Sequence, residues 1–168
     1  MPLGFAIGSI GFAAALTLAP ATPSPDFIGP RVRGVTPAVN ALLAKGAERS
    51  PTFARLIREL NDTDVVVYVE MTADLPPGLD GRLTFMANTV SVRYLHVQVS
   101  STAGLAVLIA ITGHELQHAL EVAAHPEVKS SDDLAVLYRR IGLRGSVNGR
   151  YDTAEARSVG RRVRAELS

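Results

Sequence analysis

Two histidines and a glutamate lie within a single helical turn near the middle of the chain. The sequence from Gly113 to Glu121 reads G-H-E-L-Q-H-A-L-E, so that His114 and His118 are four residues apart and Glu115 directly follows the first histidine. On an α-helix, residues four apart share a face one turn apart, so both imidazoles can bind one ion. Helices with this spacing bind zinc through the histidines and use the glutamate as a general base. We therefore predict one Zn²⁺ held by His114 and His118, with Glu115 as the catalytic residue.

The third ligand is expected to be a carboxylate. A catalytic zinc ion usually has three protein ligands, and no further histidine follows His118 at short spacing. Asp152 and Glu155, at the start of the last predicted helix, are the candidates. Asp152 is preferred because a loop-to-helix junction can point into a cleft, whereas Glu155 is the more usual ligand type. The two could instead form a capping box, or divide these roles. Glu121 could also bind the ion, although a hydrogen bond to a histidine fits a straight helix better.

Other polar side chains have weaker claims to a chemical role. His125 continues the histidine face to the helix end, where the helix dipole alone favours a histidine, and it is assigned no chemistry. Stabilising an oxyanion would require a hydrogen-bond donor. The sequence offers four candidates without choosing among them: Tyr94, His96, Tyr138 and Tyr151.

The elements that position these residues follow from hydrophobic periodicity and turn signals. Thr-Pro at residues 36–37 and Ser-Pro at residues 50–51 predict the starts of two helices. Strands are expected at residues 64–70, 83–86 and 90–100, the last with Leu95, Val97 and Val99 on one face. The motif helix should begin at Ser101 or Thr102 and end before Pro126. Two more helices are predicted, one over residues 131–140 and one from residue 152 onward.

These elements predict an α+β fold. Three strands joined by short connections favour a small, mainly antiparallel sheet, with helices before and after it. The motif helix is apolar on most sides and should be buried, where unpaired polar groups are costly. A metal ion would supply a partner for its histidine and glutamate side chains. This favours a metal-binding site over a hydrophobic core that merely contains polar residues.

Composition limits the class of protein. The chain has 168 residues, of which 47% are hydrophobic, which suits one folded domain. The formal net charge of +1 gives no indication of a nucleic-acid partner. The chain contains no cysteine, which excludes disulfides, cysteine nucleophiles and cysteine-based zinc sites.

The N-terminal segment predicts export. Residues 3–19 are apolar or small, no charged side chain precedes Asp26, and Ala-Pro-Ala at residues 19–21 offers a cleavage site. We expect a signal peptide at residues 1–21, a linker at 22–34 and a single domain at 35–168. The mature protein would then be periplasmic or extracellular. The alternative is an uncleaved leader that anchors the chain in a membrane, since the apolar run approaches a spanning length.

The HExxH helix, placed after a small sheet and between flanking helices, resembles that of the zincin-like metallopeptidases, in particular compact gluzincin-type domains. The segment from His114 to Val122 and the late Tyr-Asp-Thr sequence also look like those of uncharacterised exported bacterial proteins. The resemblance implies a zincin-like fold in which the two histidines bind zinc and Glu115 is the base. It also implies that the strand at residues 90–100 binds an extended substrate. Neither the third histidine of metzincins nor a clear E-x-x-x-D of gluzincins is present.

The expected function is zinc-dependent hydrolysis, most simply of a peptide bond, with a peptide or protein as substrate. Two alternatives stay open at this point. The chain could be a zinc-binding structural or interaction domain without turnover, or a hydrolase of a non-peptide amide such as a cell-wall fragment. Replacing Glu115 by glutamine separates the first alternative from hydrolysis, because the ligands would be retained.

Overall fold

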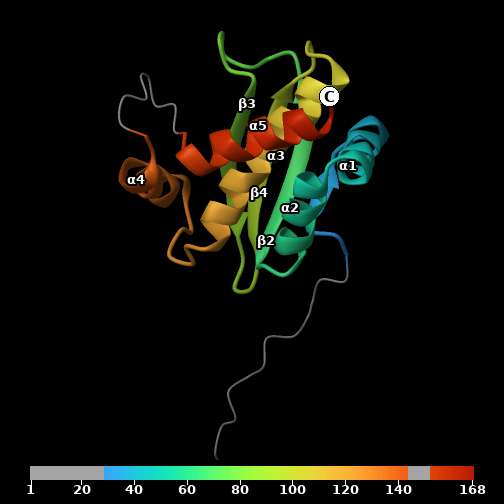
Figure 1. The fold of residues 1–168 in the computed structure, drawn as a ribbon. Coiled ribbons are helices and arrows are strands. Elements are labelled where there is room, and N and C mark those ends of the chain that lie inside the picture. Colours follow the sequence, from blue (N-terminus) through green and yellow to red (C-terminus); the bar gives the residue numbers. More distant parts are fainter. Residues whose placement is uncertain (1–28, 144–151) are drawn as a thin grey trace, which may run out of the picture.

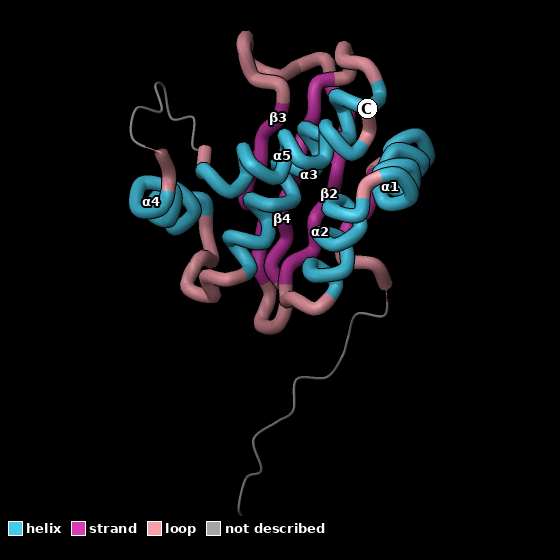
Figure 2. Tube along the Cα trace, viewed as in Figure 1, coloured by secondary structure: helices cyan, strands magenta, loops and turns pink. Residues whose placement is uncertain are grey.

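The computed structural model describes residues 29–143 and 152–168. Within these ranges the chain forms five helices and one four-stranded mixed sheet, which confirms the α+β class (Figures 1 and 2). The elements in chain order are β1 (Val32–Gly34), α1 (Pro37–Arg49), α2 (Pro51–Asn61), β2 (Val65–Thr72), β3 (Gly81–Asn88), β4 (Arg93–Ser100), α3 (Leu105–Ala123), α4 (Ser131–Ile141) and α5 (Ala154–Glu166). The expected signal peptide lies outside the described residues. Residues 32–34, which the sequence places in the linker, form β1.

The prediction of a mainly antiparallel sheet is wrong. The strand order is β1-β2-β4-β3; β1 pairs with β2 and β2 with β4 in parallel, and only β3 and β4 are antiparallel. Residues 73–80 carry the chain from the end of β2 past the neighbouring position to β3, and β4 then returns between the two strands. Strands that follow each other in sequence are neighbours in only about two-thirds of cases, and here the connection is long enough to skip a position.

This topology places β4 inside the sheet and β3 at its edge. Both edges of β4 are paired, so a substrate strand cannot add to residues 90–100, in contrast to what the sequence led us to expect. The alternation predicted for β4 is correct, since Leu95, Val97 and Val99 are fully buried against the helices. The edge of β3 that faces away from β4 has no partner strand among the described residues.

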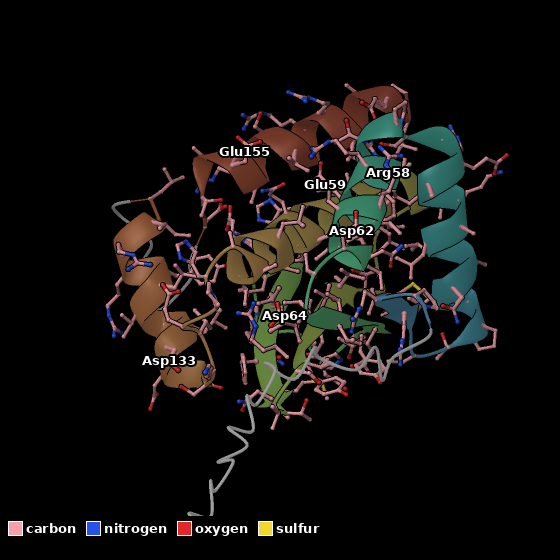
Figure 3. The ribbon with its side chains drawn as sticks, turned by 90° about the horizontal axis from the view of Figure 1, so that it is seen from below. Arg58, Glu59, Asp62, Asp64, Asp133 and Glu155 are labelled. Carbon is pink, nitrogen blue, oxygen red and sulfur yellow. The ribbon has the colours of Figure 1, made fainter. Side chains whose placement is uncertain are left out.

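Helices α3 and α5 are layered on one face of the sheet, whereas α4 stands beside its β3 edge (Figure 1). Seen from below, the sheet, α3 and α5 follow one another as successive layers (Figure 3). Apolar residues of α3 such as Ile109 and Leu116 are fully buried. The helix begins later than predicted: Gly104 is its N-cap, without a side-chain cap hydrogen bond, rather than Ser101 or Thr102. In the part of the chain that the structure describes, no helix is both long and apolar enough to span a membrane.

Candidate metal centre

The two motif histidines lie on α3 and face the same point. Helical periodicity places His114 and His118 one turn apart, and their Nε2 atoms are 3.2 Å from each other. The His118 ring is buried, whereas that of His114 is about one-quarter exposed, with 24% of its side chain accessible. Two imidazole nitrogens this close are favourable only if a proton or a cation lies between them.

Asp152 completes a group of three donor atoms. It lies just before α5, and its Oδ1 is 3.5 Å from Nε2 of His114 and 3.9 Å from Nε2 of His118. This oxygen is buried and has no hydrogen-bond partner among the described residues. Tetrahedral zinc, with bonds of about 2.0–2.1 Å, places neighbouring ligand atoms about 3.3 Å apart. The two nitrogens and the unpaired oxygen therefore fit a zinc ion between them.

The other polar atoms of His118 and Asp152 have partners of their own. Nδ1 of His118 is 2.8 Å from Oε2 of Glu121, the hydrogen bond expected from the sequence. Oδ2 of Asp152 accepts a hydrogen bond from Nε of Arg157 at 2.5 Å. Such contacts fix the orientation of both side chains and leave Nε2 of His118 and Oδ1 of Asp152 directed at the shared point.

The pKa values of the two histidines are shifted in opposite directions. Burial, together with the nearby His118, lowers the pKa of His114 below its ordinary value. Burial also acts to lower the pKa of His118, but its hydrogen bond to Glu121 and the charges of Glu115 and Asp152 outweigh that effect and raise it. The difference arises because only His118 has the hydrogen bond to Glu121 and the nearby charge of Glu115.

The close packing of α5 on α3 brings Asp152 to the histidines. Gly160 of α5 lies against His114, and a Cβ added to Gly160 would meet the Cβ of His114 at 3.3 Å. Val163, one turn later, packs against Gly113 of α3. Small residues on both helices let the two backbones approach, so that the start of α5 reaches the middle of α3.

Glu115 points to the other side of the same turn, toward β3. Its side chain is buried. A Cβ atom added to Gly81 would be only 2.5 Å from Oε1 of Glu115. A larger residue at the start of β3 would therefore push this carboxylate out of its position. Burial raises the pKa of Glu115 to about 7; the charge of His118 opposes this rise, and that of Asp152 adds to it. A carboxyl group with a pKa near neutrality can both accept and donate a proton.

A groove leads from the surface to Glu115 and His118. It has a volume of about 550 Å³ and lies between the free edge of β3 and helix α4, which stands beside that edge in Figure 1. Most of its lining is apolar. The lining residues on the β3 side include Leu83 and Phe85, and those on α4 include Leu134, Ala135 and Tyr138. A molecule in this groove would contact the buried carboxylate and one of the two histidines.

The structure separates the other candidate residues from the cluster. Glu155 is exposed in the first turn of α5 and is not part of the group of three (Figure 3). Tyr94 and His96 lie on the face of the sheet that points away from α3, as their alternation with buried Leu95 requires. His125 contacts Glu127 at the surface.

Two of the tyrosines named as oxyanion donors need separate mention. Tyr138 lines the groove, but its hydroxyl donates to the backbone carbonyl of His118 at 3.2 Å, and its ring packs edge-on against the His118 ring. It therefore supports this histidine rather than offering a free donor. Tyr151 lies outside the described residues.

Three residues that help to form the site were not predicted from the sequence. Thr153, rather than Asp152, is the N-cap of α5. Threonine is a preferred cap, and the Tyr-Asp-Thr-Ala sequence does not tell which polar residue takes that position. Arg157 and Gly160 carried no signal at all, because their roles depend on contacts between α5 and distant residues.

Comparisons with known proteins do not place the chain in a family. No family model matches the chain, and no significant match was found among curated proteins or solved structures. The assignment of a role therefore depends on the site itself. The described residues place two imidazole nitrogens and one carboxylate oxygen around a point, beside a buried glutamate and an open groove.

Proposed function

We propose that the protein is a zinc-dependent hydrolase, most simply a metallopeptidase, with Glu115 as general base. The observation that carries this proposal is the position of Glu115. This carboxylate is buried next to His118 at the base of a groove wide enough for a substrate. A structural zinc site is closed by four protein ligands, whereas a catalytic one keeps a position open. Among the described residues, the only group of side chains that could hold a metal ion has three members, His114, His118 and Asp152, which would leave a fourth position open.

The division of labour between the ion and the chain follows from this arrangement. Zinc held by His114, His118 and Asp152 would supply a Lewis acid that polarises a carbonyl group and lowers the pKa of water. Glu115 would accept the proton of the attacking water as its oxygen bonds to the carbonyl carbon. The same side chain would then deliver that proton to the leaving nitrogen as the carbon–nitrogen bond breaks.

An extended peptide fits the free edge of β3. Hydrogen-bonded pairs alternate along an antiparallel ladder, and Ser100 N–H donates to the carbonyl of Asp80. The following position, Gly81, and likewise Leu83, therefore direct their backbone N–H and C=O groups away from β4 toward the groove. A substrate strand could bind these groups by β-augmentation, with its side chains against the apolar wall of α4. This supports a peptide over a compact polar substrate.

Glu115→Gln is the test of this function. The variant keeps every proposed ligand, so zinc content and fold should be unchanged, while the turnover number falls by roughly 10²–10⁴-fold, the contribution of a general base. Cleavage of a library of unstructured peptides by the zinc-loaded protein provides the rate. Glu155→Gln is the matched control, because this glutamate is exposed in α5, and it should change neither zinc content nor rate.

Two results would contradict the proposal. Zinc-loaded wild type that cuts no peptide, although it binds the ion tightly, would identify a structural or interaction domain. Retention of full activity by Glu115→Gln would exclude this residue as the base.

A further inference from the structure

The hydroxyl of Thr153 connects α5 to the metal-binding helix. Thr153 is buried, with 5% of its surface exposed, and its Oγ1 accepts the N–H of Ala156 at 3.1 Å as the cap of α5. An N–H can only donate, so the hydroxyl proton is free to serve a second partner. That partner is Oε1 of Glu121, at 2.6 Å.

Glu121 passes this contact on to His118. An ionised carboxylate accepts hydrogen bonds and donates none, so both Thr153 and Nδ1 of His118 must donate to it. With its hydrogen on Nδ1, the neutral His118 ring has a lone pair on Nε2. This is the nitrogen that faces His114 and Asp152. The chain of contacts therefore selects the imidazole tautomer that can bind a cation.

We propose that Thr153 is a positioning residue of the metal centre, acting on His118 through Glu121. The inference rests on the proposed metal site but not on hydrolysis. Thr153 directly follows Asp152, so the same turn that supplies the carboxylate ligand also orients the buried histidine. Docking of the first turn of α5 onto α3 thus assembles two of the three ligands at once.

A role limited to capping would give different results. Thr36 caps α1 with the same geometry, since its Oγ1 accepts the N–H of Val39 at 3.3 Å, yet it is exposed and lies on no path to the histidines. Loss of an N-cap hydroxyl lowers the stability of the folded chain wherever it occurs. Thr36→Val is therefore the control for the stability effect of removing such a cap.

Zinc affinity of the folded protein is the first measurement, made by competition with a chromophoric chelator well below the unfolding temperature. Thr153→Val should weaken zinc binding by roughly 10-fold or more, the effect typical of losing an outer contact to a ligand. Thr153→Ser, which keeps the hydroxyl, should restore most of the affinity, and Thr36→Val should bind zinc as wild type does.

The tautomer of His118 in the metal-free protein is the second measurement, and long-range ¹H–¹⁵N correlation spectra report it. In alkaline buffer, where the His118 ring is neutral, wild type should carry the hydrogen on Nδ1, and Thr153→Val should show a mixture of tautomers. In a Glu121→Gln background, Thr153→Val should have little additional effect, because Thr153 acts through this carboxylate. Should Thr153→Val fail to fold, Thr153→Ala carries the same expectations.

Wild-type affinity and an unchanged tautomer in the Thr153 variant would overturn the proposal. An equal loss of zinc affinity in Thr36→Val would also overturn it, because the effect of Thr153 would then be that of any helix N-cap. These outcomes are distinct from failure of the proposed function, in which zinc binds and responds to Thr153 although no peptide is cut.

Discussion

Helix α3 carries two polar clusters, one at its middle and one at its C-terminal end, and they differ in how their hydrogen-bonding groups are used. At the end, the guanidinium of Arg93 is 4% exposed and pairs with both oxygens of Asp64, each at 2.7 Å. It also donates to backbone carbonyls that follow the last turn of the helix or belong to it: Val122, Ala123, His125 and Val128. Every donor of the arginine has an acceptor, and the cluster is complete without a ligand.

In the middle of the helix the balance is reversed. His114, His118 and Asp152 direct acceptor atoms at one another, and the buried oxygen of Asp152 has no hydrogen-bond partner among the described residues. Buried polar groups are normally satisfied, so an unsatisfied group points to something that the protein binds. The comparison teaches that burial and charge alone do not separate a structural cluster from a functional one. What separates them is whether donors and acceptors balance.

The largest effect should come from breaking the complete cluster. Arg93→Met removes a buried cation that also caps α3. We expect the free energy of unfolding to fall by about 3 kcal/mol. This is the lower end of the range for breaking a buried ion pair, because Asp64 is nearly half exposed. Denaturant unfolding of the metal-free protein measures this value.

Arg157→Met is the matched control for this change. Its guanidinium pairs with Asp152 but is 53% exposed, so its removal should cost less than about 1 kcal/mol. Equal losses in the two variants would remove the distinction between the clusters.

The incomplete cluster should gain stability from zinc. At a free concentration of 100 times Kd, the ion should raise the free energy of unfolding by about 2.7 kcal/mol, because it binds the folded chain alone. The shift of the thermal midpoint with added zinc or chelator gives the measurement. Asp152→Asn, which replaces the unpaired oxygen with a weaker ligand, should show little of this shift. A full shift in the variant would exclude Asp152 as a ligand.

A smaller effect is expected at a third, complete cluster. Glu166 of α5 accepts hydrogen bonds from Ser50 and Thr52 at the start of α2. Partial burial acts to raise the pKa of Glu166, but these hydrogen bonds outweigh it and lower the pKa below the ordinary value of 4.5. The resulting stability is present at neutral pH and is lost as the pH falls through the pKa of the folded state.

Glu166→Gln should therefore cost about 1 kcal/mol at pH 7, a value reduced by solvent exposure. The difference from wild type should shrink in acid, and unfolding curves across pH 3–7 would show it. Zinc affinity should be unaffected. A variant whose deficit persists in acid would mean that the charge of Glu166 is not what stabilises α2.

Local patterns predicted the elements well and their arrangement less well. The alternation in β4 and the Thr-Pro and Ser-Pro helix starts all appear in the structure. Strand order could not be read in the same way, because alternation reports which face of a strand is buried and says nothing about its neighbours. Strand β4 lies inside the sheet because residues 73–80 carry the chain past its position to β3. Hydrophobic periodicity within the strands contains no information about the path of this connection.

The sequence by itself determined the inner half of the candidate site. His114, Glu115 and His118 belong to one helix, and the helical repeat alone sets where their side chains point. The other half was decided by tertiary structure. Asp152 and Thr153 reach the histidines only because α5 packs closely across α3, where Gly160 lies against His114. Contacts within one turn are encoded by spacing, whereas contacts between distant segments depend on packing that spacing does not contain.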